Sequence, residues 1–360
     1  MKRFTLVLSG VARLSSLLKD PQNDSDELIP YDYILKPDAI AQVPLEVRSQ
    51  ARLLDATGQA LVDRHVFDLP SLCTQGDVVV LNDTKVFPAR LALFRATGGK
   101  IDVLLVESTE DSLWIALANP SKNLKPGVVL FDEHGTSVAE IIDRFAREID
   151  SPTRFLIKIL APKSIETLGE MPLPPYIKVP LESMERYQTV YANQGTSVAA
   201  PTAGLHFDQQ VLDSLVAKGV VIAKVELSVG LDTFLPVRSK TIVEHRIHSE
   251  RYSVSVDSWN SIQNASRVLA IGTTVVRTLE SVALTGELNG RTSLFIHGNF
   301  DFKVVDRLMT NFHIPRSSLL LMIDAFVGPR WRNIYEYALE SGYRFLSFGD
   351  AMLVDRLKSN

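Results

Sequence analysis

The segment Gly76–Leu91, GDVVVLNDTKVFPARL, decides the fold. Its apolar run Val78–Leu81 predicts a strand that is buried on both faces, as in a parallel sheet covered by helices. The run ends in the polar residues 82–85, and open α/β sheets usually bind ligands at the carboxyl ends of their strands. The alternative is a turn in which Asn and Asp side chains bond to nearby backbone groups. We favour that alternative for Asn82 more than for Lys85.

The chain after Leu205 continues with alternating strand and helix patterns. Apolar residues at helical spacing predict helices at 208–218, 258–267, 273–284, 317–327 and 334–342. Apolar runs predict strands at 220–229, 252–256, 268–272, 292–296 and 308–312, and a last strand-like segment at 344–353. We therefore expect the α/β fold class, with a mostly buried sheet flanked by helices.

The segment between Arg90 and Leu168 has six short apolar stretches separated by turn sequences. This pattern predicts a small antiparallel barrel or sandwich, followed by a short helix at 163–169. The expected domains are a discontinuous α/β domain at 28–89 and 169–360, and an inserted all-β barrel domain at 90–168. Residues 1–27 precede both. Their basic start and repeated Ser and Leu suit an organellar targeting peptide, a short amphipathic helix or a disordered extension.

The composition excludes several classes of protein. With 46% hydrophobic and 22% charged residues, the 360-residue chain has the composition of a soluble globular protein. No apolar run has the length that a membrane-spanning helix needs. The single Cys73 excludes an internal disulfide and a cysteine-rich metal site, so we expect a cytoplasmic protein, with organellar import as an alternative. Because the net charge is −4, a nucleic-acid partner would need a local basic patch.

The stretch Arg186–Asp208, RYQTVYANQGTSVAAPTAGLHFD, is the first candidate for a ligand-binding loop. The small residues around Pro201 allow a ligand to approach the backbone closely. Asp208 is expected to cap the helix that follows, so His206 lies where a loop meets a helix N-terminus, a common place for anions and polar ligands. The alternative is a tight connecting loop with a buried, hydrogen-bonded histidine.

Three more polar clusters follow apolar stretches, at 244–250 (EHRIHSE), 272–280 (GTTVVRTLE) and 311–315 (NFHIP). Thr273 and Thr274 open a helix directly after a buried strand, which suits a carboxylate or phosphate. The sequence has neither the GxGxxG fingerprint nor a P-loop. His245 and His248 lie near two glutamates, but the spacing is not HExxH, which disfavours a metal site. Together the clusters predict a polar ligand pocket.

Read as a series, these motifs resemble the S-adenosylmethionine:tRNA ribosyltransferase-isomerase family of the queuosine pathway. The resemblance extends from Tyr31 to Asp355, and its most specific motifs are PTAGLHF (201–207) and MTNFHIP (309–315). It implies an α/β domain interrupted by a small β-barrel. It also implies transfer of the ribosyl part of S-adenosylmethionine to 7-aminomethyl-7-deazaguanine in tRNA. The ribose is isomerised to give epoxyqueuosine, and adenine and methionine leave.

The implied reaction requires a base that removes a proton beside the sulfonium and an acid that protonates the departing adenine. Histidine suits both roles near neutral pH. The catalytic residues expected on this basis are His206 first and His248 second, with Arg246 orienting the substrate. S-Adenosylmethionine is expected to contact Thr202, Gly204, Thr273, Thr274, Arg277, Asn311 and His313. We expect a monomer that uses S-adenosylmethionine as co-substrate and needs no metal, flavin, nicotinamide or membrane.

Three features depart from the family pattern. Asp232 stands where the family usually has glycine, His297-Gly298-Asn299 replaces a Tyr-Pro-Gly-like turn, and Asp324 replaces a small residue. These departures leave open a catalytically inactive relative that only binds tRNA or a metabolite. An unrelated methyltransferase is a weaker alternative, because the chain lacks a recognisable glycine-rich cofactor loop.

Overall fold

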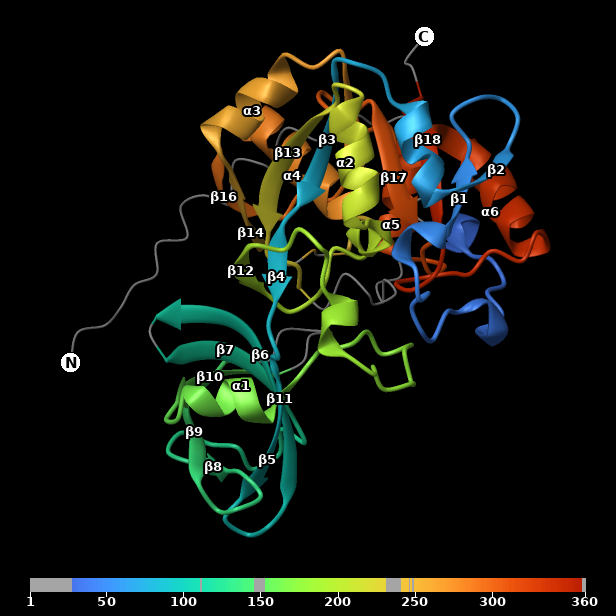
Figure 1. Ribbon diagram of the computed structural model, residues 1–360. Coiled ribbons are helices and arrows are strands. Elements are labelled where there is room, and N and C mark those ends of the chain that lie inside the picture. Colours follow the sequence, from blue (N-terminus) through green and yellow to red (C-terminus); the bar gives the residue numbers. More distant parts are fainter. Residues whose placement is uncertain are drawn as a thin grey trace.

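The computed structural model describes residues 28–110, 112–145, 153–230, 241–245, 247 and 249–357. They form a large α/β part and a smaller β-barrel attached below it (Figure 1). The predicted extension 1–27 lies outside the described residues, and so does Asp232. No helix in the described ranges is long and apolar enough to cross a membrane.

A nine-stranded mixed sheet forms the centre of the α/β part. Its strand order is β16-β14-β13-β3-β15-β17-β18-β1-β2, and the four strands from β13 to β17 run parallel. The strand predicted at Val78–Leu81 is β3, and all six of its residues are buried. The bounds are β1 Arg52–Asp55, β2 Val62–His65, β3 Asp77–Asn82, β13 Val221–Leu227, β14 Glu250–Val254, β15 Arg267–Ile271, β16 Asn289–Thr292, β17 Arg307–Asn311 and β18 Ala351–Asp355.

Alternate residues of the central strands contribute to two cores on opposite faces of this sheet. In β3, Val78 and Val80 belong to the larger core, whereas Val79 and Leu81 belong to the smaller one, because successive side chains of a strand point to opposite faces. The larger core is covered by α3 Val256–Gln263, α4 Thr273–Thr285, α5 Ser318–Val327 and α6 Trp331–Glu340. The smaller core is covered by α2 Gln209–Ala217 and the 3-10 helix Val66–Leu72. The predicted α/β class is confirmed.

The inserted segment is a closed antiparallel barrel with a core of its own. Six strands pair in the order β5-β6-β7-β10-β9-β8, and a pairing between β5 and β8 closes the ring. All six strands predicted here are present, and a barrel is formed instead of a sandwich. The bounds are β5 Arg90–Arg95, β6 Lys100–Glu110, β7 Leu113–Asn119, β8 Val129–Phe131, β9 Ser137–Arg144 and β10 Arg154–Ile159, followed by α1 Lys163–Leu168 and β11 Gly169–Glu170.

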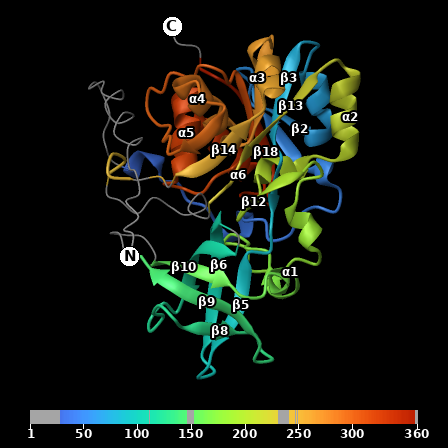
Figure 2. The same ribbon diagram turned by 90° about the vertical axis from the view of Figure 1, so that its left-hand side faces the viewer.

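The barrel lies on the side of the sheet where the parallel strands end. β3 runs through β4 (Thr84–Val86) directly into β5, so that its carboxyl end points at the barrel (Figure 1). β4 pairs with β12 (Gln194–Ser197), which brings the small-residue loop back to the same place. The view after a 90° turn has the same order, with the sheet above and the barrel below (Figure 2).

Several predicted elements have different bounds in the structure, and three of them show why. The strand predicted at 292–296 is wrong, since β16 ends at Thr292. Leu294 and Ile296 are instead buried in the larger core, and the Leu294 carbonyl accepts a 3.1 Å hydrogen bond from Arg277 Nε of α4. The helix predicted at 258–267 begins earlier, because Ser255 Oγ accepts the Ser258 N–H and caps α3. The last strand begins only at Ala351.

Candidate functional site

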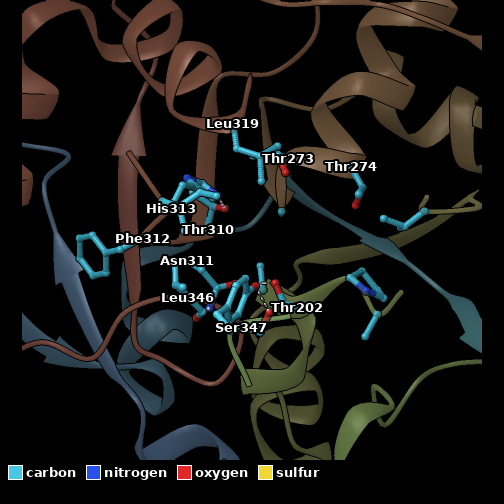
Figure 3. A pocket seen from close by; sticks show the side chains of 17 residues that line it. Thr202, Thr273, Thr274, Thr310, Asn311, Phe312, His313, Leu319, Leu346 and Ser347 are labelled. Carbon is cyan, nitrogen blue, oxygen red and sulfur yellow. Dashed lines mark hydrogen bonds between the residues drawn. The ribbon is translucent and has the colours of Figure 1, made fainter. Parts of the chain in front are cut away.

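An open cleft of about 550 Å³, measured out into solvent, lies at the carboxyl edge of the sheet. β15 and β17 are neighbours and both end there, which is where open α/β sheets bind ligands. The walls are residues 272–274 after β15, residues 310–314 around the end of β17, and residues 200–203 of the small-residue loop. In Figure 3, Thr273 and Thr274 face this space from one side and Thr310, Asn311 and His313 from another, with Thr202 and Ser347 below.

The N-terminus of α4 forms one wall of the cleft. Gly272 has a φ of +91°, which lets the chain turn from β15 into the helix. Thr273 and Thr274 form the first helical turn, whose N–H groups have no partner in the preceding turn and carry the positive end of the helix dipole. Both threonines line the cleft, and their binding of a ligand stays a prediction.

Asn82 holds this wall in place. Its side-chain Oδ1 accepts the N–H groups of Thr84 and Leu227, at 3.2 and 3.1 Å. Its Nδ2 donates to the Leu227 carbonyl at 3.1 Å and to Thr274 Oγ1 at 3.4 Å. The interpretation of Asn82 as a residue that satisfies nearby backbone is confirmed. Lys85 is exposed and does not line the cleft.

Asn311 stabilises the opposite wall of the cleft through two hydrogen bonds of its side-chain amide. Thr202 Oγ1 donates to Asn311 Oδ1 at 2.9 Å, and Asn311 Nδ2 donates to the Leu346 carbonyl at 3.0 Å. One buried amide thus joins β17, the 3-10 helix Thr202–His206 and the loop before β18. Because Thr202 uses its proton in this bond, its hydroxyl oxygen remains able to accept a hydrogen bond from a ligand.

His313 lines the cleft as a neutral imidazole. Burial lowers its pKa to about 3. Tyr335 Oη accepts the His313 backbone N–H at 3.1 Å and lies 3.3 Å from Nδ1. Nε2 lies 3.3 Å from Thr310 Oγ1, so a hydroxyl group lies beside each ring nitrogen. His313 therefore presents a neutral ring, in which one nitrogen donates and the other accepts a hydrogen bond.

The sequence analysis missed two polar residues of the cleft, Tyr176 and Ser347. Their hydroxyl oxygens are 2.7 Å apart, and both residues line the cleft. Tyr176 comes from the extended PLPPYI segment and Ser347 from the loop before β18. A lone Tyr or Ser among apolar residues gives no local signal for a ligand site.

His206 lies in a different environment. Its Nδ1 is 3.0 Å from the Ala203 carbonyl oxygen and its Nε2 is 2.8 Å from the Gly349 carbonyl oxygen. The ring is buried and lines a second, smaller cleft instead of the main one. Burial lowers the pKa of His206 more than the two carbonyls raise it. With both nitrogens facing carbonyls, this geometry favours the structural role that the sequence left open as an alternative.

Gly204 and Arg277, both predicted to bind S-adenosylmethionine, do not line the main cleft. A Cβ on Gly204 would come within 1.9 Å of Tyr191 Oη, so glycine is needed there for packing. The Arg277 guanidinium forms a buried ion pair with Glu250, whose other oxygen accepts the Gly230 N–H at 2.9 Å. This pair joins α4 to the ends of β13 and β14.

The predicted residues Arg246 and His248 lie outside the described residues. Of the same cluster, His245 packs edge-on against Phe295, with ring centroids 5.3 Å apart. Among the residues that the structure describes, no group of three or more His, Cys, Asp or Glu side chains could hold a metal ion. The departure at Asp324 has a structural reason, since its carboxylate accepts a 3.1 Å hydrogen bond from Tyr31 Oη.

Comparison with known proteins identifies the family. The family described as "Queuosine biosynthesis protein" matches residues 28–354. A Moorella thermoacetica protein named S-adenosylmethionine:tRNA ribosyltransferase-isomerase is 44% identical over 345 residues, which cover 90% of this chain and 98% of that protein. A Thermosynechococcus vestitus protein of the same name is 40% identical over 348 residues, covering 93% and 97%.

The fold has a counterpart among solved structures. A crystal structure of the Thermotoga maritima S-adenosylmethionine tRNA ribosyltransferase is 31% identical, covers 90% of this chain and 99% of that chain, and has a TM-score of 0.52. The matched length, the identities and the shared fold agree with the order of motifs in the sequence. This chain therefore belongs to the S-adenosylmethionine:tRNA ribosyltransferase-isomerase family of queuosine biosynthesis proteins.

Proposed function

We propose that this chain transfers the ribosyl part of S-adenosylmethionine to 7-aminomethyl-7-deazaguanine in tRNA and isomerises it to epoxyqueuosine, with release of adenine and methionine. The observation that carries the proposal is the cleft at the carboxyl edge of the sheet, which combines a helix N-terminus with a neutral histidine in a chain of this family. The proposal includes cytoplasmic location, a monomer, and no requirement for metal, flavin or nicotinamide.

We place the methionine carboxylate of S-adenosylmethionine at the N-terminus of α4. Thr273 and Thr274 are 6% and 7% exposed, so a carboxylate bound there would be largely shielded from water. Shielding strengthens its attraction to the helix dipole and to the free N–H groups.

The charge of the cleft suits a reactive sulfonium. No acidic side chain lines it within the described ranges. A carboxylate beside the sulfonium would stabilise the cation and so oppose removal of a proton from the neighbouring ribose carbon. A neutral lining of hydroxyl, amide and imidazole groups leaves that carbon acidic. We expect the His313 imidazole and the hydroxyl oxygen of Thr202, which both line the cleft, to orient the ribose by hydrogen bonds.

The proton acceptor is assigned by elimination among the sequence candidates. His206 has both ring nitrogens against backbone carbonyls, and His313 has a pKa too low for an efficient base near neutral pH. We therefore keep His248, a sequence-based candidate, for the acid–base role and Arg246 for substrate orientation.

Incubation of the purified protein with S-adenosylmethionine and tRNA carrying the aminomethyl base tests the proposal. Adenine and methionine should appear in equal amounts, and the digested tRNA should contain epoxyqueuosine by mass spectrometry. Intact S-adenosylmethionine with bound tRNA would instead support the inactive relative. Methylated tRNA with S-adenosylhomocysteine would reveal a methyltransferase.

A further inference from the structure

A second cleft, of about 300 Å³ measured out into solvent, adjoins the main one and shares Ser347 with it. It is lined by Arg48, Arg186 and Arg344, together with His206. The three arginines come from segments far apart in the chain, so the fold gathers positive charge at this place. Of the three, only Arg186 lies in a stretch that the sequence marked as a candidate ligand-binding loop.

Two of these guanidinium groups lack a carboxylate partner in the described part of the chain. Arg48 donates to the carbonyls of Leu205 and Glu185, at 3.1 and 3.0 Å. Arg186 donates to the Leu45 carbonyl. By contrast, Arg344 forms an ion pair with Asp350 at 3.1 Å. The backbone carbonyls therefore hold Arg48 and Arg186 in place without neutralising their charges.

The positive charges of Arg48 and Arg186 repel each other in a partly buried site. Burial lowers the pKa of Arg48, and the positive charge of Arg186 lowers it further. The negative charge of Asp208 acts in the opposite direction on the pKa of Arg48. Each guanidinium has five N–H donors, and only a few are used by the carbonyls. An anion with several oxygens would use the remaining donors and relieve the repulsion.

We propose that this arginine-lined cleft binds a backbone phosphate of the tRNA substrate, next to the nucleotide whose base enters the main cleft. This inference rests on the proposed function. Arginine forks match the spacing of phosphate oxygens. The clefts meet at Ser347, as a base and its adjacent phosphate require. Since the chain has a net charge of −4, RNA binding depends on such local positive sites.

The test measures tRNA affinity as a function of salt for Arg48→Gln, Arg186→Gln and the charge-preserving Arg48→Lys and Arg186→Lys. Unmodified tRNA is the probe, so that binding is separated from turnover. Each Gln variant should weaken binding and reduce the magnitude of the slope of log K against log salt by about 0.7–0.9, the value for one lost phosphate contact. The Lys variants should keep the slope. Lys218→Gln, at the far end of α2, removes one exposed positive charge and should leave it unchanged.

A second measurement uses only the wild-type protein and so does not depend on how the variants fold. Phenylglyoxal modifies accessible arginines, and mass spectrometry locates the sites. Unmodified tRNA should protect Arg48 and Arg186, whereas S-adenosylmethionine alone should not. Protection by S-adenosylmethionine, or unprotected arginines in the tRNA complex, would overturn the inference.

The two failures are distinguishable. A wild-type protein that releases adenine but whose Gln variants keep the wild-type salt slope refutes the phosphate site alone. A wild-type protein that releases no adenine refutes the proposed function.

Discussion

At the scale of single residues, hydrogen-bond partners separate the histidines more clearly than their sequence motifs do. His206 is the first catalytic candidate of the sequence and His313 is expected only to bind the substrate, yet His206 is held between two carbonyls while His313 lines the main cleft. Sequence spacing placed both near the ligand but could not reveal their partners. The partners are Ala203 and Gly349 for His206, and Thr310 and Tyr335 for His313. Gly349 and Tyr335 lie on other segments of the chain.

We expect His206→Ala to lose stability instead of chemistry. The neutral ring donates its single N–H to one of the two carbonyls, so the substitution leaves that buried carbonyl unpaired, which should lower the free energy of unfolding by about 1–3 kcal/mol. Urea unfolding measures this loss, and turnover per folded molecule should stay within a few-fold of wild type. His134→Ala, which removes an exposed ring, is the control. A turnover loss of about 10²–10⁴-fold with unchanged stability would restore His206 as the acid or base.

His313 should make the protein sensitive to acid. Its folded pKa of about 3 lies below the unfolded value of about 6.5. As the pH falls below about 6.5, the unfolded chain gains a proton that the folded chain does not. The stabilisation is therefore complete above that pH and declines by about 1.4 kcal/mol per pH unit towards pH 3. The free energy of unfolding, measured with urea between about pH 6.5 and 5, should rise less steeply with pH in His313→Gln than in the wild type. The difference between the two slopes should approach the value for one proton. Equal slopes would contradict the assignment.

At the scale of elements, apolar pattern and caps predicted most strands and helices. Asp208 caps α2 as expected, its carboxylate accepting the Val211 N–H at 3.0 Å. The failure at 292–296 is instructive, because Leu294 and Ile296 alternate like a strand but pack beneath α4. An alternating apolar pattern indicates which residues are buried. Whether such a segment also pairs as a strand of the sheet depends on the tertiary structure around it.

The N-terminus of α4 can be tested against its own C-terminus. Gly272 and Gly286 flank the helix with φ of +91° and +74°. Alanine at either position is strained and should cost about 1–3 kcal/mol of stability. Only Gly272→Ala should also weaken S-adenosylmethionine binding, because Gly272 lines the cleft. Calorimetric titration of both variants measures the difference. Equal affinities would mean that the ligand does not use this helix end.

At the scale of the whole molecule, the order of motifs predicted the inserted barrel, but not the site that the fold assembles. β3 enters the barrel directly, and the small-residue loop returns beside β4. The cleft therefore combines residues from segments far apart in the chain, among them Tyr176 and Ser347. Contacts between segments that lie so far apart in the chain cannot be predicted from local sequence patterns.

Activity should survive treatment with EDTA and thorough dialysis. The proposed chemistry uses only side chains and the helix end, and the chain has one cysteine and no HExxH motif. Adenine release measured before and after chelation should agree within error. Loss of activity that zinc or iron restores would contradict a metal-free reaction.

A crystal structure of the protein with S-adenosylmethionine tests the central claim most directly. We predict that the ligand occupies the main cleft. Its methionine carboxylate should lie within hydrogen-bonding distance of the first N–H groups of α4, and its ribose should lie beside Thr202 and His313. A ligand whose carboxylate lies instead between Arg48 and Arg186 would contradict the placement of the ligand at α4 and the phosphate site together.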